Sequence, residues 1–248
     1  MFRDFKGRII WSADGLSPKQ LTDLLSDPAV DFPKEEVAIK LDRLFFEQYG
    51  KFVIRRLQDD FGIPVFVDAK IIEIPSKTLA IAQTYLQDYQ PWMLNVMAGA
   101  CSTGNADDDL LSDFAQACAE VGTRSCAVTV LTSKTSELVI DEFNGREPAD
   151  QVNYYAKKLQ ECGLTDIVCS PKEIDIVKQY GLDINTPGVR LAASSTDDQA
   201  RVDTPHNAIA NGARRIVVGR DIYRADRDQP ADIVTNIAKI VADLDGQN

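Results

Sequence analysis

The chain has almost no histidine, because His206 is the single one among 248 residues. A Ser-His-Asp triad, a Cys-His pair or a metal site with several histidines would have to use this one residue. His206 follows Thr204-Pro205, which predicts the cap and first turn of a surface helix. We therefore expect any catalysis to rest on carboxylates, lysines and arginines.

Paired cysteines are also missing. The five cysteines are scattered and show no CxxC spacing, which predicts neither a zinc site nor a disulfide framework. They are Cys101, Cys118, Cys126, Cys162 and Cys169. We expect buried thiols and no bound metal.

Positive charge and long apolar runs are scarce as well. The chain has 27 Lys and Arg residues and 38 Asp and Glu residues, which gives a net charge of -11. This negative charge argues against nucleic-acid or anionic-membrane partners. Local arginines can still bind an anionic small ligand. No stretch is long enough to span a membrane, and residues 1–7 lack the apolar core of a signal peptide. We expect a cytoplasmic protein.

Short apolar runs that alternate with amphipathic segments dominate the sequence. Eight runs are candidate strands: residues 8–13, 37–40, 64–68, 93–96, 126–131, 166–169, 188–190 and 215–219. Strands this apolar, separated by helices, indicate a parallel sheet covered by helices. A (β/α)8 TIM barrel needs about 250 residues, so we expect residues 1–248 to form one such domain. An open, doubly wound sheet is the alternative.

Capping signals mark the helices between these strands. Ser17 predicts a helix start, and a second helix is expected to run from the second strand to about Asp60. Gly122 and Gly163 predict helix ends, and residues 170–173 form a capping box. A final helix is expected over residues 233–244. The acidic run at residues 107–109 fits a helix N-terminus better than a metal site.

Polar residues follow several of the candidate strands. They are Asp14, Lys40, Asp68, Lys70, Thr132, Arg190 and Arg220. In a barrel these positions meet at the C-terminal rim, where active sites lie. Their convergence on one rim predicts a functional site.

Asp68 and Lys70 lie two residues apart, and strand side chains with that spacing point to the same face. A lysine beside carboxylates keeps its proton, and in a dry pocket it can stabilise a carbanion and then protonate it. A structural ion pair at the rim is the alternative interpretation.

The end of the chain suggests a phosphate site, because barrels often bind phosphate after strands seven and eight. Arg190 and Gly219-Arg220 follow those strands, and glycine allows close approach while arginine donates two parallel hydrogen bonds. The hydroxyl- and amide-rich residues 194–199 suit a loop that closes on a polar ligand, with an ordinary solvated loop as the alternative.

Residues 68–75 read Asp-Ala-Lys-Ile-Ile-Glu-Ile-Pro. With the rest of residues 65–75 and several later segments, they resemble the orotidine 5′-phosphate decarboxylase family, whose motif is Asp-x-Lys-x-x-Asp-Ile-Pro. Further similar segments follow in the family's order: residues 127–133, 168–171, 187–190, 198–202 and 217–220. The resemblance covers most of the chain.

The resemblance implies cofactor-free loss of CO2 from C6 of the pyrimidine of orotidine 5′-phosphate, giving uridine 5′-phosphate. Lys70 would protonate C6, Asp68 would lie beside the departing carboxylate, and Lys40 would extend the charge network to the ribose. The remaining contacts would be Asp14 to ribose, Thr132 to the pyrimidine, and Gln199, Arg190, Gly219 and Arg220 to phosphate. Family members are commonly dimers, in which one subunit lends the second motif carboxylate, here Glu73, to its partner's site.

The sequence departs from the family pattern near the pyrimidine. Glu73 replaces an aspartate, Lys77 stands where threonine is usual, and residues 97–98 read Met-Ala instead of His-Ala. The first strand ends with the bulky Trp11. Two alternatives follow. One is a related barrel enzyme that acts on another phosphorylated substrate, either a modified nucleotide or a sugar phosphate, and the sugar-phosphate relatives use magnesium. The other is a non-catalytic nucleotide-binding homologue.

Overall fold

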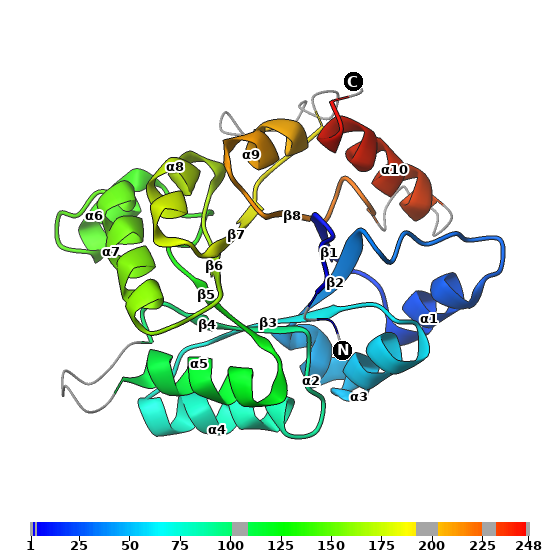
Figure 1. Ribbon diagram of the computed structural model, residues 1–248, viewed down its shortest axis with the longest axis horizontal. Coiled ribbons are helices and arrows are strands. Elements are labelled where there is room, and N and C mark those ends of the chain that lie inside the picture. The colour runs from blue at the N-terminus through cyan, green and yellow to red at the C-terminus, as the bar shows by residue number, and fades with distance from the viewer. Residues whose placement is uncertain (1, 3, 101–108, 192–202, 225–231, 247–248) are drawn as a thin grey trace.

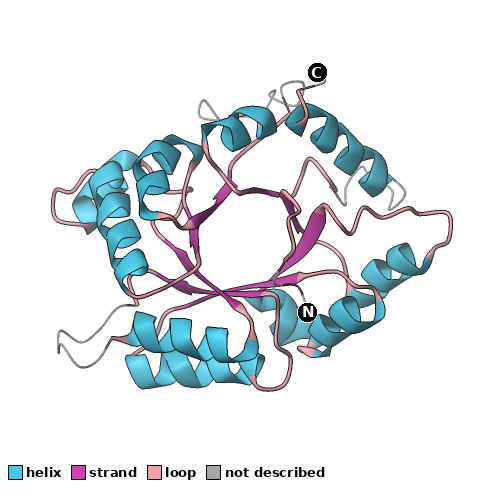
Figure 2. Ribbon diagram, viewed as in Figure 1, coloured by secondary structure: helices cyan, strands magenta, loops and turns pink. Residues whose placement is uncertain are grey.

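The computed structural model describes residues 2, 4–100, 109–191, 203–224 and 232–246. Within these residues eight parallel strands form a closed barrel, in which each strand pairs with the next and β8 pairs with β1. Figure 2 shows the strands as a central ring with helices outside it. The predicted TIM barrel is confirmed, and the open-sheet alternative is wrong.

The strands are short and largely buried, as expected of a parallel sheet covered by helices. They are β1 (Ile9–Ser12), β2 (Val37–Asp42), β3 (Val65–Ile71), β4 (Met93–Met97), β5 (Arg124–Val128), β6 (Asp166–Val168), β7 (Asp183–Pro187) and β8 (Arg215–Val218). Two predictions were misplaced. The seventh strand precedes residues 188–190 instead of containing them, and the fifth begins at Arg124 and ends at Val128.

Helices form the outer layer of the barrel (Figure 1). They are α1 (Pro18–Ser26), α2 (Arg43–Tyr49), α3 (Phe52–Arg55), η1 (Arg56–Asp60), α4 (Pro75–Leu86), α5 (Leu110–Val121), α6 (Ser136–Glu142), α7 (Pro148–Glu161), η2 (Pro171–Glu173), α8 (Ile174–Val177), η3 (Lys178–Tyr180), α9 (Pro205–Asn211) and α10 (Asp232–Leu244). No helix in the described part of the chain is long and apolar enough to cross a membrane.

The capping signals explain most helix ends. Ser17 and Gln20 form the capping box of α1, and Gly122 ends α5 in the left-handed conformation. The helix expected up to Asp60 is instead interrupted at Gly50, where φ is +82°. The chain resumes as α3 and continues as the π-helical η1.

Apolar side chains fill two layers, because successive residues of a strand point to opposite faces of the sheet. The larger layer lies between strands and helices and includes Trp11, Phe114 and Ile237. The smaller layer fills the barrel interior and includes Ile10 and Phe66. This interior packing leaves the C-terminal end of the barrel for polar side chains.

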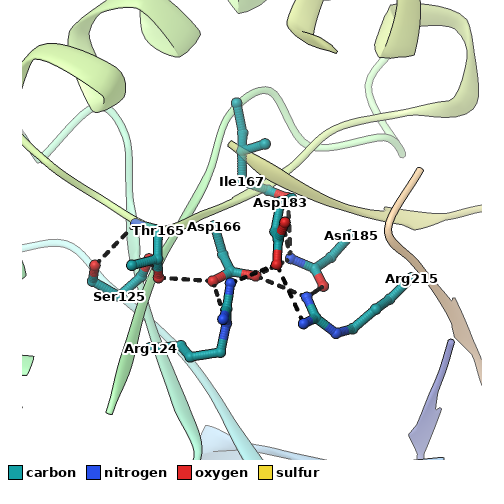
Figure 3. A network of polar contacts seen from close by, with 8 residues as sticks. All are labelled: Arg124, Ser125, Thr165, Asp166, Ile167, Asp183, Asn185 and Arg215. Carbon is teal, nitrogen blue, oxygen red and sulfur yellow. Dashed lines mark hydrogen bonds and ion pairs between the residues drawn. The ribbon is translucent and has the colours of Figure 1, made fainter. Parts of the chain in front are cut away.

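A buried ionic network closes the N-terminal end of the barrel (Figure 3). Arg215 is 1% exposed and lies 3.1 Å from Asp166, which also contacts Arg124 at 2.7 Å. Asn185 donates to the same Asp166 carboxylate, and Asp183 bridges the two arginines. Four of these side chains belong to the first residues of β5–β8, and Asn185 lies in the middle of β7. In barrels this end contributes stability and the opposite end carries function.

Candidate active site

A cavity of about 410 Å³ opens at the C-terminal ends of the strands. Its polar lining consists of Ser12, Lys40, Asp68, Lys70, Thr132, Arg190 and Arg220. Its apolar wall includes Phe66, Val128, Val130, Val168, Pro187 and Val217. A concave, largely apolar pocket with a few converging polar groups is the usual form of a small-molecule site.

Four charged side chains alternate in sign along one side of this cavity. Lys40 is 7% exposed and bridges Asp14 at 2.7 Å and Asp68 at 3.1 Å. Lys70 lies 2.7 Å from the same oxygen of Asp68, Oδ2. Asp14 is not part of the cavity lining itself, but Ser12 and the backbone N–H of Asp42 hold its carboxylate in place at 2.6 and 2.8 Å.

Asp68 and Lys40, the two buried members of this row, are ionised. Burial alone would raise the pKa of Asp68, but Lys40, Lys70 and a hydrogen bond from Asn95 outweigh it and lower that pKa to about 2. Burial likewise opposes the charge of Lys40, and the neighbouring Asp68 and Asp14 nevertheless raise its pKa. The row therefore has a buried pair of opposite charges at its centre, with the more accessible Asp14 and Lys70 at its two ends.

Lys70 is the most accessible charge of the row, with 41% of its side chain exposed. Its backbone has a φ of +43°, a conformation that is costly for a residue with a side chain. The spacing rule expected Asp68 and Lys70 on one face of a regular strand. The two side chains do meet, but on an irregular strand end.

The opposite side of the cavity is cationic. Arg190 and Arg220 line it together with Gly219, and Asp221, which is 3% exposed in its side chain, lies 3.5 Å from Arg190. The pKa of Arg190 is lowered overall. Burial and the nearby Arg220 and Arg224 lower it, and Asp221 offsets only part of their effect. In the described part of this side, two arginines line the cavity and one carboxylate lies beside them, and this excess of positive charge suits a bound anion such as phosphate.

Of the predicted site residues that the structure describes, Asp14 and Glu73 are not part of the cavity lining. Glu73 is exposed and lines a separate cavity of about 280 Å³ beside Arg43, Lys51 and Tyr85. Gln199, with the rest of the loop at residues 194–199, lies outside the described residues. The described residues contain no group of three or more His, Cys, Asp and Glu side chains that could hold a metal ion.

Three residues of the site were not predicted. Ser12 binds Asp14, Asn95 contacts the Asp68–Lys70 segment, and Asp221 contacts Arg190. Asn95 is 1% exposed in the middle of β4, and a polar residue inside an otherwise apolar strand was the signal that could have revealed it.

Comparison with known proteins gives consistent matches over most of the chain. The family described as orotidine 5′-phosphate decarboxylase / HUMPS matches residues 8–233. The orotidine 5′-phosphate decarboxylase of Pseudoalteromonas translucida is 33% identical over 223 residues, covering 86% of this chain and 91% of the relative. That of Nitrosococcus oceani is 34% identical over 226 residues, covering 89% and 92%. The crystal structure of orotidine 5′-phosphate decarboxylase from Lactobacillus acidophilus superposes with a TM-score of 0.73 at 25% identity, covering 96% of this chain and 99% of that one.

Proposed function

Since the chain belongs to the orotidine 5′-phosphate decarboxylase / HUMPS family and is a carboxy-lyase of this type, we propose that it converts orotidine 5′-phosphate to uridine 5′-phosphate without a cofactor. The observation that carries the proposal is the Asp68–Lys70 pair, 2.7 Å apart, in a cavity whose other side is lined by Arg190 and Arg220. This cavity offers a proton donor and a phosphate-binding side to one ligand.

In the proposed reaction, the bond between C6 and its carboxyl carbon breaks and CO2 leaves. The electron pair stays on C6, and the ammonium group of Lys70 donates a proton to it before recovering one from water. Asp68 would lie beside the departing carboxylate, where its fixed negative charge disfavours the substrate more than the product. Lys40 would keep Asp68 ionised and in position.

The remaining predicted residues would bind the substrate. Arg190 and Arg220, with the backbone of Gly219 and the side chain of Gln199, would hold the phosphate. Asp14 would bind the ribose with Lys40. Thr132, which lies on the cavity wall, would contact the pyrimidine.

An assay of metal-free protein with orotidine 5′-phosphate tests this proposal directly. Turnover is measured as the loss of the substrate's absorbance. Lys70→Ala should lower kcat by about 1,000-fold or more, since general acid catalysis supplies a factor of this size, while uridine 5′-phosphate still binds. Lys239→Ala, on the exposed face of α10, is the matched control and should keep full activity. Retained activity in Lys70→Ala would exclude this residue as the proton donor.

If the wild-type protein does not turn over orotidine 5′-phosphate, two further assays distinguish the alternative functions. Tight binding of uridine 5′-phosphate without turnover would favour a non-catalytic nucleotide-binding role. Activity on a sugar phosphate that depends on added magnesium would favour the related barrel reaction. Either result would refute the decarboxylase proposal.

We further propose that the chain acts as a homodimer in which Glu73 enters the partner's cavity. Glu73 does not line the candidate active-site cavity of its own chain, and its neighbours Ile72 and Ile74 are 59% and 63% exposed. Large exposed apolar side chains beside a motif residue suit a protein–protein interface. A second copy that covers them would bring the carboxylate to another chain.

Complementation between inactive subunits tests the shared site. Lys70→Ala and Glu73→Ala chains, co-expressed with different tags, should form mixed dimers with one intact site and regain about a quarter of wild-type activity at random pairing. No recovery in a purified mixed dimer would place Glu73 outside the partner's site. Glu73→Asp is the companion variant: a higher rate would mean that the longer side chain misplaces the charge, and a lower rate that the site is adapted to glutamate.

A further inference from the structure

The pairing between β3 and β4 is irregular beside the cavity. Val67 pairs with Leu94, and the next pair is Ile71 with Val96, so β3 advances four residues while β4 advances two. The extra residues of β3 include Asp68 and Lys70, and Lys70 takes its left-handed backbone conformation here. A bulge of this kind leaves backbone groups without their ladder partners and re-aims side chains.

One side chain of β4 fills this gap. The amide of Asn95 accepts a hydrogen bond from the backbone N–H of Lys70 at 2.7 Å and donates one to Oδ1 of Asp68 at 2.7 Å. The orientation of the amide is unambiguous, because an N–H only donates and an ionised carboxylate only accepts. Asn95 therefore touches both members of the pair from the buried side.

We infer that Asn95 is a positioning residue, which holds the backbone of Lys70 and the carboxylate of Asp68 in the geometry that proton transfer to the substrate requires. The inference rests on the proposed function. Asn95 is not part of the cavity lining, so it acts through the two residues it binds.

The carboxylate of Asp68 shows how this works. Its Oδ2 contacts both lysines, at 2.7 and 3.1 Å, and these contacts alone leave it free to rotate about the side chain. The bond from Asn95 to Oδ1 fixes that rotation. The bond to the Lys70 N–H stabilises a backbone conformation that the chain would otherwise leave, and the ammonium group would move with it.

Asn185 provides a matched control at the other end of the barrel. It is equally buried, at 0% exposure, and it also donates to a strand aspartate, Asp166, at 3.0 Å. Asn185→Ala should therefore destabilise the fold to a similar degree as Asn95→Ala. It removes no contact to the cavity.

The first test compares steady-state kinetics with orotidine 5′-phosphate. Asn95→Ala should lower kcat by about 10- to 100-fold, as expected for a displacement of about 1 Å, with KM and the affinity for uridine 5′-phosphate within about threefold of wild type. Asn185→Ala should keep the wild-type kcat. A kcat of Asn95→Ala within about threefold of the control would overturn the inference.

A second test needs no turnover, and so it separates this inference from the proposed function. Carbon-13 NMR of labelled aspartate carboxyls follows the ionisation of Asp68 in the whole protein. In Asn95→Asp the new carboxylate faces Asp68, and the like charge disfavours ionisation of both groups, so the pair of carboxyls should take up its first proton at least one pH unit higher than Asp68 does in wild type. An unmoved titration in this variant would mean that the contact does not control Asp68, and would overturn the inference even in an active enzyme.

Discussion

Asp68→Asn removes the charge that joins the two lysines of the cavity, and its effect on folding should depend on pH in a way that the structure defines. The Asp68 side chain is 9% exposed and lies 3.1 Å from Lys40 and 2.7 Å from Lys70. Burial disfavours its ionisation, yet the two lysines and Asn95 lower its pKa from 3.8 to about 2. Folding therefore favours the ionised form.

The size of this effect follows from linkage between protonation and folding. At about 1.4 kcal/mol per pKa unit, the shift is equivalent to about 2 kcal/mol of stability. Because the folded-state pKa is the lower one, this contribution is complete above about pH 5, and it is lost as the pH falls through the folded pKa, with about half remaining at pH 3. Replacing Asp68 also leaves Lys40 with one counter-charge fewer, which lowers the stability at both pH values.

Guanidinium unfolding of wild-type protein and Asp68→Asn at pH 6 and pH 3 measures this contribution. The difference in unfolding free energy should shrink by about 1 kcal/mol at the lower pH. Asp23→Asn is the control, since Asp23 and Lys19 form a surface pair with 61% and 82% of their side chains exposed and should contribute little at either pH. A difference for Asp68→Asn that stays constant with pH would refute the argument.

Three further predictions concern other parts of the barrel. Arg215→Met should lower the unfolding free energy by about 3 kcal/mol, because it breaks a buried ion pair with Asp166, and calorimetry should find this loss with kcat/KM unchanged. Gly219→Ala should leave the thermal midpoint of unfolding almost unchanged, since the new methyl group would lie 3.4 Å from Ser12 Cβ. It should raise KM about tenfold by narrowing the proposed phosphate site, and an unchanged KM would exclude Gly219 from that site. A thiol reagent should modify at most one cysteine quickly in the folded protein and all five after unfolding, because four cysteines are buried: Cys118, Cys126, Cys162 and Cys169.

The barrel could be predicted because most of its strands are apolar on both faces. The seventh strand escaped prediction for a physical reason. Its inward residues, Asp183 and Asn185, belong to the ionic network at the N-terminal end, so the strand does not show an apolar run.

The charged rim could also be predicted, since a barrel brings the C-terminal ends of its strands together. The contact between Asp68 and Lys70 follows from their spacing, but the bulge that shapes it does not. The bulge brings Lys70 to Asn95, which is 25 residues away in sequence and meets it only after β3 and β4 pair. The position of Glu73 was also beyond local patterns, because nothing in the spacing of residues 68–73 indicates that the chain turns away from its own cavity.

The two polar networks of the barrel differ in the chemistry of their cations. At the N-terminal end, Arg124 and Arg215 surround Asp166, and a guanidinium group stays charged at any pH at which the protein is folded. At the C-terminal end, Lys40 and Lys70 take the same place around Asp68, and an ammonium group can give up a proton. Lys70 alone among these four cations lines the cavity with a substantially exposed side chain. A ligand in the cavity can therefore reach an ammonium group of the second network, and this is where the proposed reaction needs its proton donor.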